Sequence, residues 1–297
     1  SEKFTLLPKD EGALNIMMST LLRMENGDLG LIYLVKHDAE ISNVYIRRSS
    51  DEGETWSERT KITTEPQGYT IMSSGNRVLR LPSGRILVPV MYAPRVNDVY
   101  GGDNTWSMVW YSDDDGYTWE RSPGWVALPN AALEPTLALL DDGNIMMSLR
   151  TRLEGKIYKS ISTDDGLSWS QPVDMGLTTP SSTNVVHTIP STGDLMIIWN
   201  NVFSSTNNPR NPLTVAISKD NGTTWHLVRN IMEGKPGTGQ GFPVVSFHGR
   251  KVIFQFYTSG ISTTVRIFDI DTLYHSIDST VSTADLEKAP TPQAVYD

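Results

Sequence analysis

The sequence contains no cysteine among its 297 residues. Disulfide bonds, cysteine-ligated zinc sites and thiol nucleophiles are therefore excluded. This absence does not fix the compartment, because secreted proteins can also fold without disulfides. No apolar run approaches the roughly 18 residues of a membrane-spanning helix, and no signal-peptide pattern opens the sequence. We expect a soluble protein, which is either cytoplasmic or, after removal of a signal, secreted or periplasmic.

Positive charge is also scarce. The chain has 25 lysines and arginines against 34 aspartates and glutamates, which gives a net charge of −9. This balance argues against nucleic acid or an anionic membrane as the main partner, although it is compatible with a local basic pocket. The 38% hydrophobic content is that of a globular protein, and the length fits one large repeat domain or two ordinary ones.

What the sequence does contain is a repeated octapeptide, Ser-x-Asp-x-Gly-x-(Thr/Ser)-Trp. Its four copies begin at Ser49, Ser112, Ser162 and Ser218. An aspartate accepts backbone N–H groups two residues ahead, glycine supplies a positive φ, and the tryptophan covers the resulting turn. A calcium loop is the alternative reading, but the late bidentate glutamate of such loops is absent. We therefore predict a structural turn and no metal.

A second repeat runs in phase with the octapeptide and predicts hairpins, because two apolar runs flank a turn that ends in glycine. A third apolar run leads into each octapeptide, and a short fourth run follows each tryptophan. The five predicted hairpins are Ser19–Val35, Val78–Met91, Thr136–Leu149, Val185–Trp199 and Val244–Tyr257.

Units of four strands and roughly 50–60 residues are typical of a β-propeller with antiparallel blades. We predict one all-β domain over residues 1–297, with a short helical stretch at residues 284–288 as the one exception. The fifth blade has three strands and no octapeptide, so we expect residues 2–7 to supply its fourth strand and close the ring. A six-bladed ring with one blade incomplete or absent is the alternative. The five blades span about residues 13–65, 70–127, 130–177, 180–232 and 238–272.

The octapeptides resemble the Asp-boxes, or BNR repeats, of the sialidase (neuraminidase) superfamily, and the resemblance covers nearly the whole chain. More specific is the stretch Leu133–Gly143, which contains Glu134, together with Met147–Arg150. In sialidases a glutamate opens an inner strand and polarises a tyrosine nucleophile, and an arginine on the next strand holds the substrate carboxylate. The resemblance assigns these places to Glu134 and Arg150.

Two further matches to the family are looser. Arg210 occupies the place of a second carboxylate-binding arginine, and Asp38 resembles the loop aspartate that acts as acid and base. In sialidases two blades separate that aspartate from the glutamate, whereas here one blade separates Asp38 from Glu134. Either a blade is absent from this chain or Asp38 is not that aspartate.

The sequence also departs from the family pattern at two places. Met17 stands where the arginine of the first inner strand is expected, and Phe242 stands near the place of the nucleophilic tyrosine. A phenylalanine cannot attack a sugar. The likeness is therefore closer to bacterial sialidase-like proteins of unassigned substrate than to proven sialidases.

The residues themselves support a site at the propeller axis. Glycosidic cleavage needs one group that protonates the leaving oxygen and another that attacks or activates water. Inner strands converge on one mouth, so Glu134 and the loop residue Asp38 are the candidates. Arg150 ends an apolar run and needs a buried partner or an anionic ligand. The competing interpretations are a structural ion pair between Glu134 and Arg150, and a solvated loop position for Asp38.

Four further residues are candidates for substrate contacts. Arg77 opens the second inner strand and offers the positive charge that Met17 lacks, and Arg210 offers another unless it is simply a loop residue. Tyr69 is a replacement nucleophile or a stacking group for the sugar. Asn200, which follows a tryptophan at a strand end, is expected to bind sugar hydroxyls.

These observations lead to two hypotheses. The first is an exo-acting glycoside hydrolase of the sialidase superfamily, which uses activated water on a terminal acidic sugar of a glycan, such as a sialic acid or a uronic acid. It requires no metal or organic cofactor. The second is a non-catalytic, lectin-like carbohydrate-binding propeller that has lost the tyrosine. Neither hypothesis sets the oligomeric state.

Overall fold

The chain forms strands almost throughout. The computed structural model describes residues 5–7, 14–64, 68–72, 77–101, 104–203, 210–234, 238–258 and 262–275. These residues form twenty β strands and two short helices, α1 (Val96–Gly101) and α2 (Ile270–Tyr274). The all-β prediction is confirmed, whereas the two helices were not anticipated. The predicted helical stretch at residues 284–288 lies outside the described residues.

The strands fall into five consecutive groups. Group 1 contains β1 (Asn15–Arg23), β2 (Leu29–Lys36), β3 (Ser42–Ser49) and β4 (Thr60–Lys61), and group 2 contains β5 (Tyr69–Ile71), β6 (Leu79–Arg80), β7 (Ile86–Ala93), β8 (Trp106–Ser112) and β9 (Glu120–Ala127). Group 3 contains β10 (Leu133–Leu139), β11 (Ile145–Arg150), β12 (Lys156–Ser162) and β13 (Val173–Thr178). Group 4 contains β14 (Val185–Thr188), β15 (Leu195–Asn200), β16 (Leu213–Ser218) and β17 (His226–Met232), and group 5 contains β18 (Gln240–His248), β19 (Lys251–Thr258) and β20 (Ser262–Asp269).

Within each group the strands pair antiparallel with their neighbours, as the hairpin pattern predicts. Groups 3 and 4 are four-stranded sheets, and group 5 is three-stranded among the described residues. Groups 1 and 2 are joined into one sheet by a parallel pairing of Ser42 in β3 with Tyr69 in β5. Group 2 thus has two short inner strands, β5 and β6, which both pair with β7, whereas one inner strand starting at Val78 was predicted.

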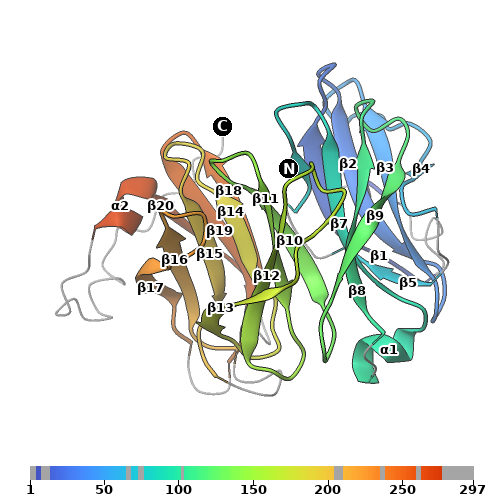
Figure 1. Cartoon of the computed structure of the whole chain (residues 1–297). Helices are drawn as coiled ribbons and strands as arrows, with labels where there is room; N and C mark the ends of the chain where they lie inside the picture. Colours follow the sequence, from blue (N-terminus) through green and yellow to red (C-terminus); the bar gives the residue numbers. More distant parts are fainter. Residues whose placement is uncertain are drawn as a thin grey trace.

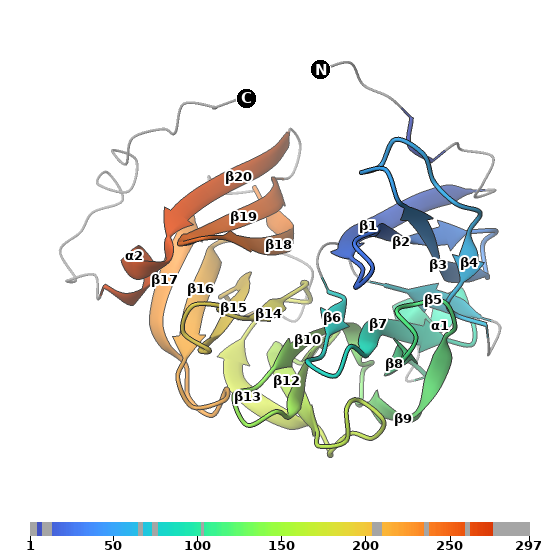
Figure 2. The ribbon, with the colours of Figure 1, turned by 90° about the horizontal axis from the view of Figure 1, so that it is seen from above.

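The groups follow one another around a common centre, with the first strand of each group innermost (Figures 1 and 2). Strand β10 contacts β7 and β14, and β14 contacts β18. Apolar cores fill the spaces between neighbouring groups. Ile32 and Val88 share the core between groups 1 and 2, and Ile198 and Phe254 share the core between groups 4 and 5. This packing aims the inner strands at one central region.

The ring is open between group 5 and group 1 in the described part of the chain, where no strand pairing joins them (Figure 2). Of the segment expected to close the ring, residues 2–4 lie outside the described residues. Residues 5–7 form no strand, and Leu7 packs against Leu31 and Tyr33 of group 1. Closure by residues 2–7, and a count of five rather than six blades, stay predictions.

The octapeptides form the predicted turns, with one difference in their hydrogen bonds. In the first copy the Asp51 carboxylate accepts bonds from the Thr55 backbone N–H at 2.9 Å and the Thr55 hydroxyl at 2.6 Å. The aspartate therefore accepts hydrogen bonds from the residue four positions ahead, and not from the residue two positions ahead as predicted. The Ser49 hydroxyl accepts the Gly53 N–H at 2.8 Å, and the Trp56 indole donates to the Gly53 carbonyl at 3.0 Å. Each turn ties its own group of strands together locally.

We predict that Asp51→Ala lowers the thermal midpoint at pH 7 by about 2–4 °C. Bonds from Thr55 and Ser49 lower the pKa of Asp51 from 3.8 to about 2. A carboxyl group with a depressed folded-state pKa stabilises the protein above its unfolded value, and this contribution is lost as the pH falls towards 2. Calorimetry between pH 7 and pH 2.5 should therefore show the difference from wild type shrinking below pH 4. Glu54→Ala in the same turn is the control, and an equal effect of both variants would contradict the prediction.

Candidate functional site

Three inner strands carry a bulge that faces the same central region. Pairing shifts register after Met17 in β1, after Leu133 in β10 and after Gly241 in β18. At each bulge a residue other than glycine adopts a positive φ: Met18 at 57°, Glu134 at 44° and Phe242 at 52°. Such a backbone is strained for these residues, and bulges re-aim side chains next to active sites. All three side chains line one cavity.

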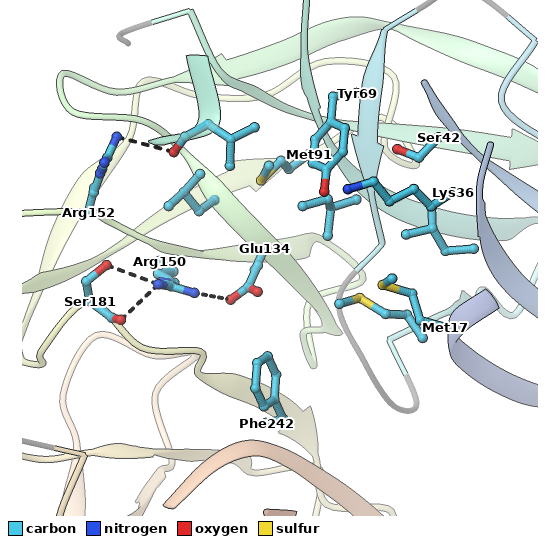
Figure 3. A pocket seen from close by; sticks show the side chains of 15 residues that line it. Met17, Lys36, Ser42, Tyr69, Met91, Glu134, Arg150, Arg152, Ser181 and Phe242 are labelled. Carbon is cyan, nitrogen blue, oxygen red and sulfur yellow. Dashed lines mark hydrogen bonds and ion pairs between the residues drawn. The ribbon is translucent and has the colours of Figure 1, made fainter. Parts of the chain in front are cut away.

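The cavity has a volume of about 380 Å³ and lies where the inner strands converge (Figure 3). One wall is polar and comes from groups 3 and 4, with Glu134, Arg150, Arg152 and Ser181. The other wall comes from groups 1 and 2 and is mostly apolar. It is lined by Met17, Met18, Leu34, Ile71 and Met91, together with Tyr69 and Lys36. The cavity thus presents a charged side and an apolar side to a ligand.

Glu134 is the anchor of the polar wall, and its side chain is held through one oxygen. Its Oε2 accepts bonds from Arg150 Nη1 at 2.8 Å and from the Thr183 hydroxyl at 2.5 Å. Arg150 Nη2 in turn donates to the Ser181 carbonyl at 2.9 Å and to the Ser181 hydroxyl at 3.1 Å (Figure 3). No described residue donates a hydrogen bond to Glu134 Oε1. This oxygen is therefore available to a group in the cavity.

Two more predicted arginines lie close to this pair. Arg77 is 2% exposed, and its Nη1 donates to the Asn184 carbonyl at 3.0 Å and lies 3.5 Å from the Glu134 carbonyl. Arg210 Nη2 lies 3.4 Å from the Ser181 carbonyl, and its guanidinium is 5.8 Å from the centre of the Phe242 ring. The structure thus brings Glu134, Arg150, Arg77 and Arg210 into one cluster from three strand groups. Of these four, Glu134 and Arg150 line the cavity, whereas Arg77 and Arg210 lie beside it.

Burial and the charges of this cluster shift the pKa values of its members. Burial raises the pKa of Glu134, but Arg150, Thr183 and Arg77 outweigh burial and hold it below the usual value of 4.5. Burial lowers the pKa of Arg77 to about 10, against the opposing effect of Glu134. Burial and the nearby Arg150 lower the pKa of Arg210. Glu134 is therefore an anion at neutral pH, and the cationic neighbours outnumber it.

The structure does not bring two other predicted residues into the cavity. Asp38 is exposed, and its Oδ1 accepts the backbone N–H groups of Glu40 and Ile41 at 2.7 Å each, so the carboxylate holds its own loop turn. Asn200 is fully buried, and its amide donates to the Pro212 carbonyl at 3.3 Å. Neither residue lines the cavity. The acid role of Asp38 and the sugar contact of Asn200 stay predictions without support from this placement.

Sequence reasoning missed several lining groups, namely Lys36, Arg152 and Ser181, as well as the three bulges. A signal for two bulges was present in the sequence. Glu134 and Phe242 each precede a proline inside a strand, and proline in a sheet is confined to edges and bulges. Lys36 and Arg152 lie near strand ends and carry no comparable signal. Tyr69, which was predicted, lines the cavity and is 7% exposed.

The described residues contain neither a metal-binding cluster nor a membrane-spanning helix. Across the ranges given above, no three histidines, cysteines, aspartates or glutamates are grouped so that they could hold a metal ion. Among the same residues, no helix has the length and apolar character required to cross a bilayer.

Comparison with known proteins gives the family. The sequence model of the BNR repeat-like domain matches residues 2–262. The chain belongs to this family. The resemblance to the sialidase superfamily is thereby confirmed, because curated relatives of the chain are named sialidases. The sialidase of Bacteroides fragilis is 23% identical over 238 residues, which is 77% of this BNR repeat-like chain and 41% of the relative.

Solved structures of sialidases share the fold of this BNR repeat-like chain. The Hadza microbial sialidase Hz136 superposes with a TM-score of 0.72 at 17% identity and covers 86% of this chain and 53% of its own. The Trypanosoma rangeli sialidase in complex with 2,3-difluorosialic acid, a covalent intermediate, has a TM-score of 0.66 at 15% identity, covering 87% of this chain and 45% of its own. At such identities the likeness concerns the fold alone. The chain spans less than half the length of the curated relatives it matches.

We predict that Glu134 and Arg150 are energetically coupled. Removal of one partner of a buried ion pair leaves an uncompensated charge, so Glu134→Gln and Arg150→Met should each lower the free energy of unfolding by about 3 kcal/mol. The double variant should cost clearly less than the sum of the two. Denaturant unfolding at pH 7 measures all four proteins. Additive effects would contradict the coupling, and Glu154→Gln, which lies outside the cavity, controls for loss of a carboxylate.

Proposed function

We propose that this chain is an exo-acting glycoside hydrolase of the sialidase superfamily that cleaves a terminal acidic sugar, such as a sialic acid or a uronic acid, from a glycan. The observation that carries the proposal is the free Oε1 of an anionic Glu134 at a cavity rich in cations. A volume of about 380 Å³ is within the range of small-ligand pockets and suits one terminal sugar. The relatives named as sialidases support the reaction class.

An acidic sugar fits the charges of the cavity. Among the described residues that line it, Glu134 is the sole carboxylate, while Lys36, Arg150 and Arg152 are cations. Arg210 adds a further positive charge beside Arg150. Guanidinium groups bind a carboxylate through planar, charge-assisted hydrogen bonds. Arg150 and Arg210 are the candidates for holding the sugar carboxylate. Arg77, which is buried and does not line the cavity, contributes positive charge without touching the sugar.

Because Phe242 replaces the tyrosine nucleophile, another group must attack the sugar. Its ring lines the cavity near the place where sialidases have a tyrosine, and it has no nucleophilic atom. In the proposed reaction Glu134 instead accepts a proton from water through Oε1, and the water oxygen attacks the anomeric carbon. Arg150 and Thr183 fix the carboxylate through Oε2, which keeps it ionised. Hydrolysis by this route needs no metal or organic cofactor.

The same phenylalanine favours a second candidate function. A propeller that kept its arginines and lost the tyrosine would bind an acidic glycan without cleaving it. Such a lectin-like protein would use Arg150 and Arg210 in the same way as the enzyme. The two functions differ in one observable, which is turnover.

We predict that the purified chain hydrolyses 4-methylumbelliferyl glycosides of acidic sugars and not the matched neutral glucoside. Glu134→Gln should lower kcat by about 10²–10⁴-fold, because a positioned general base contributes that much to a proton transfer. Glu154→Gln should behave as wild type. Full activity of Glu134→Gln would overturn the assignment of the base. Saturable binding of acidic glycans with no turnover on any substrate would establish the lectin-like alternative.

The pH dependence of the reaction supplies a separate prediction. Because the ionised carboxylate is the active form and its pKa lies below 4.5, kcat/KM should fall only as the pH drops below about 4.5. The hydroxyl of Thr183 helps to hold that pKa down, so Thr183→Val should move the acid limb to higher pH. Circular dichroism at each pH separates this shift from unfolding. An acid limb that stays in place would contradict the role of Glu134.

A further inference from the structure

A hydrolase of this kind also needs a proton for the leaving oxygen, and two groups on the apolar wall can hold one. A phenol hydroxyl and an ammonium group both donate hydrogen bonds through a proton on the heteroatom. Tyr69 of β5 and Lys36 of β2 both line the cavity, whereas Asp38 does not. They come from groups 1 and 2, and Glu134 comes from group 3. All three residues line the same cavity of about 380 Å³, so an acid on one wall and a base on the other can reach one sugar.

Tyr69 is held rigidly by the parallel pairing that joins groups 1 and 2. Ser42 is central to this junction: its hydroxyl accepts the Thr70 N–H at 2.9 Å and donates to the Thr70 carbonyl at 2.5 Å. The Ser42 N–H donates to the Gly68 carbonyl at 3.3 Å. A Cβ at Gly68 would lie only 2.7 Å from the Tyr92 ring, so the backbone before Tyr69 passes in close contact. The tyrosine therefore stands on a fixed part of the fold.

The environment of the Tyr69 ring favours a role for its hydroxyl rather than its faces. The ring packs in one cluster with Met91, Val99 and Leu133, the residue that precedes Glu134. With 7% of the residue exposed, the ring has little surface on which a sugar could stack. Figure 3 shows its hydroxyl end pointing into the cavity. The stacking role considered from the sequence is thus disfavoured.

Lys36 supplies a charge at this hydroxyl. Its Nζ lies 5.2 Å from the centre of the Tyr69 ring, and Figure 3 shows the amine directed towards the hydroxyl end. A cation beside a phenol stabilises the phenolate that forms when the proton leaves. The surrounding Met17, Leu34 and Met91 side chains keep this part of the cavity apolar, which strengthens the electrostatic effect.

We propose that Tyr69 is the general acid of the reaction and that Lys36 is the positioning residue that stabilises its phenolate. The inference rests on the proposed glycosidase function. In the step, the Tyr69 hydroxyl gives its proton to the glycosidic oxygen as the bond from that oxygen to the anomeric carbon breaks. Water forms the new bond to this carbon and gives its proton to Glu134. Transfer of the Glu134 proton to solvent, and of a solvent proton to Tyr69, restores the site.

The test is a leaving-group series measured with Tyr69→Phe. Glycosides of the acidic sugar that wild type cleaves are compared, with 4-nitrophenol as a good leaving group and an alkyl alcohol as a poor one. Tyr69→Phe should retain activity within about tenfold on the nitrophenyl substrate and lose about 10²–10³-fold on the alkyl substrate, because only the poor leaving group needs a proton. Lys36→Met should also lose more activity on the alkyl substrate than on the nitrophenyl substrate, but the loss should be smaller than in Tyr69→Phe. Lys36→Arg should recover part of the activity that Lys36→Met loses.

Two controls make the outcome decisive. Tyr92→Phe removes a neighbouring hydroxyl that does not line the cavity and should leave the series unchanged. Asp38→Asn tests the acid suggested by the family resemblance. If Asp38→Asn loses far more activity on the alkyl substrate than on the nitrophenyl substrate and Tyr69→Phe does not, the assignment of Tyr69 is overturned. The glycosidase function would remain intact. Absence of wild-type turnover on every acidic glycoside would overturn both.

Discussion

The buried contact between Glu134 and Arg150 is the interaction on which the rest of the site depends. A carboxylate that is 7% exposed needs compensation, and Arg150 and Thr183 provide it through the same oxygen, Oε2. The second oxygen then remains directed to the cavity as a basic group. Arg77 and Arg210 add more positive charge than one glutamate neutralises, so the electrostatics of the cavity favour an anionic ligand. In the proposed function, recognition and catalysis therefore both use this one electrostatic arrangement.

The fold makes this arrangement through two devices that act at different levels. The octapeptide turns fix groups 1 to 4 locally, through bonds such as those that Thr55 donates to the Asp51 carboxylate. The bulges act on the inner strands, where the positive φ of Glu134 and Phe242 aims both side chains at the axis. The turns lie away from the cavity and contribute no group to it. A strained backbone at the centre is thus supported by a regular scaffold around it.

Much of the fold could be predicted from the sequence because its signals are local. The repeated turns, the hairpin glycines and the alternating apolar runs each act within a few residues. The predicted hairpins agree with those observed, whereas β5 was not predicted and residues 5–7 do not form the expected strand. Glu134 and Arg150 were also predictable, since a family motif carries them. The places of Lys36, Arg152 and Ser181 in the cavity were not, because these side chains meet only after distant strand groups pack. Asp38 shows the converse. The sequence predicts an acid there, and the structure adds that its carboxylate closes a local turn, so the acid role stays a prediction.

The central claim is that Glu134 activates water directly, since Phe242 provides no covalent nucleophile. The stereochemistry of hydrolysis tests this claim most directly. Proton NMR of the first minutes of hydrolysis of an acidic α-glycoside distinguishes the two anomers of the released sugar before they equilibrate. The account predicts that the β-anomer appears first, because a single displacement by water inverts the anomeric carbon. Initial release of the α-anomer would show a double displacement through a covalent intermediate and would contradict the account.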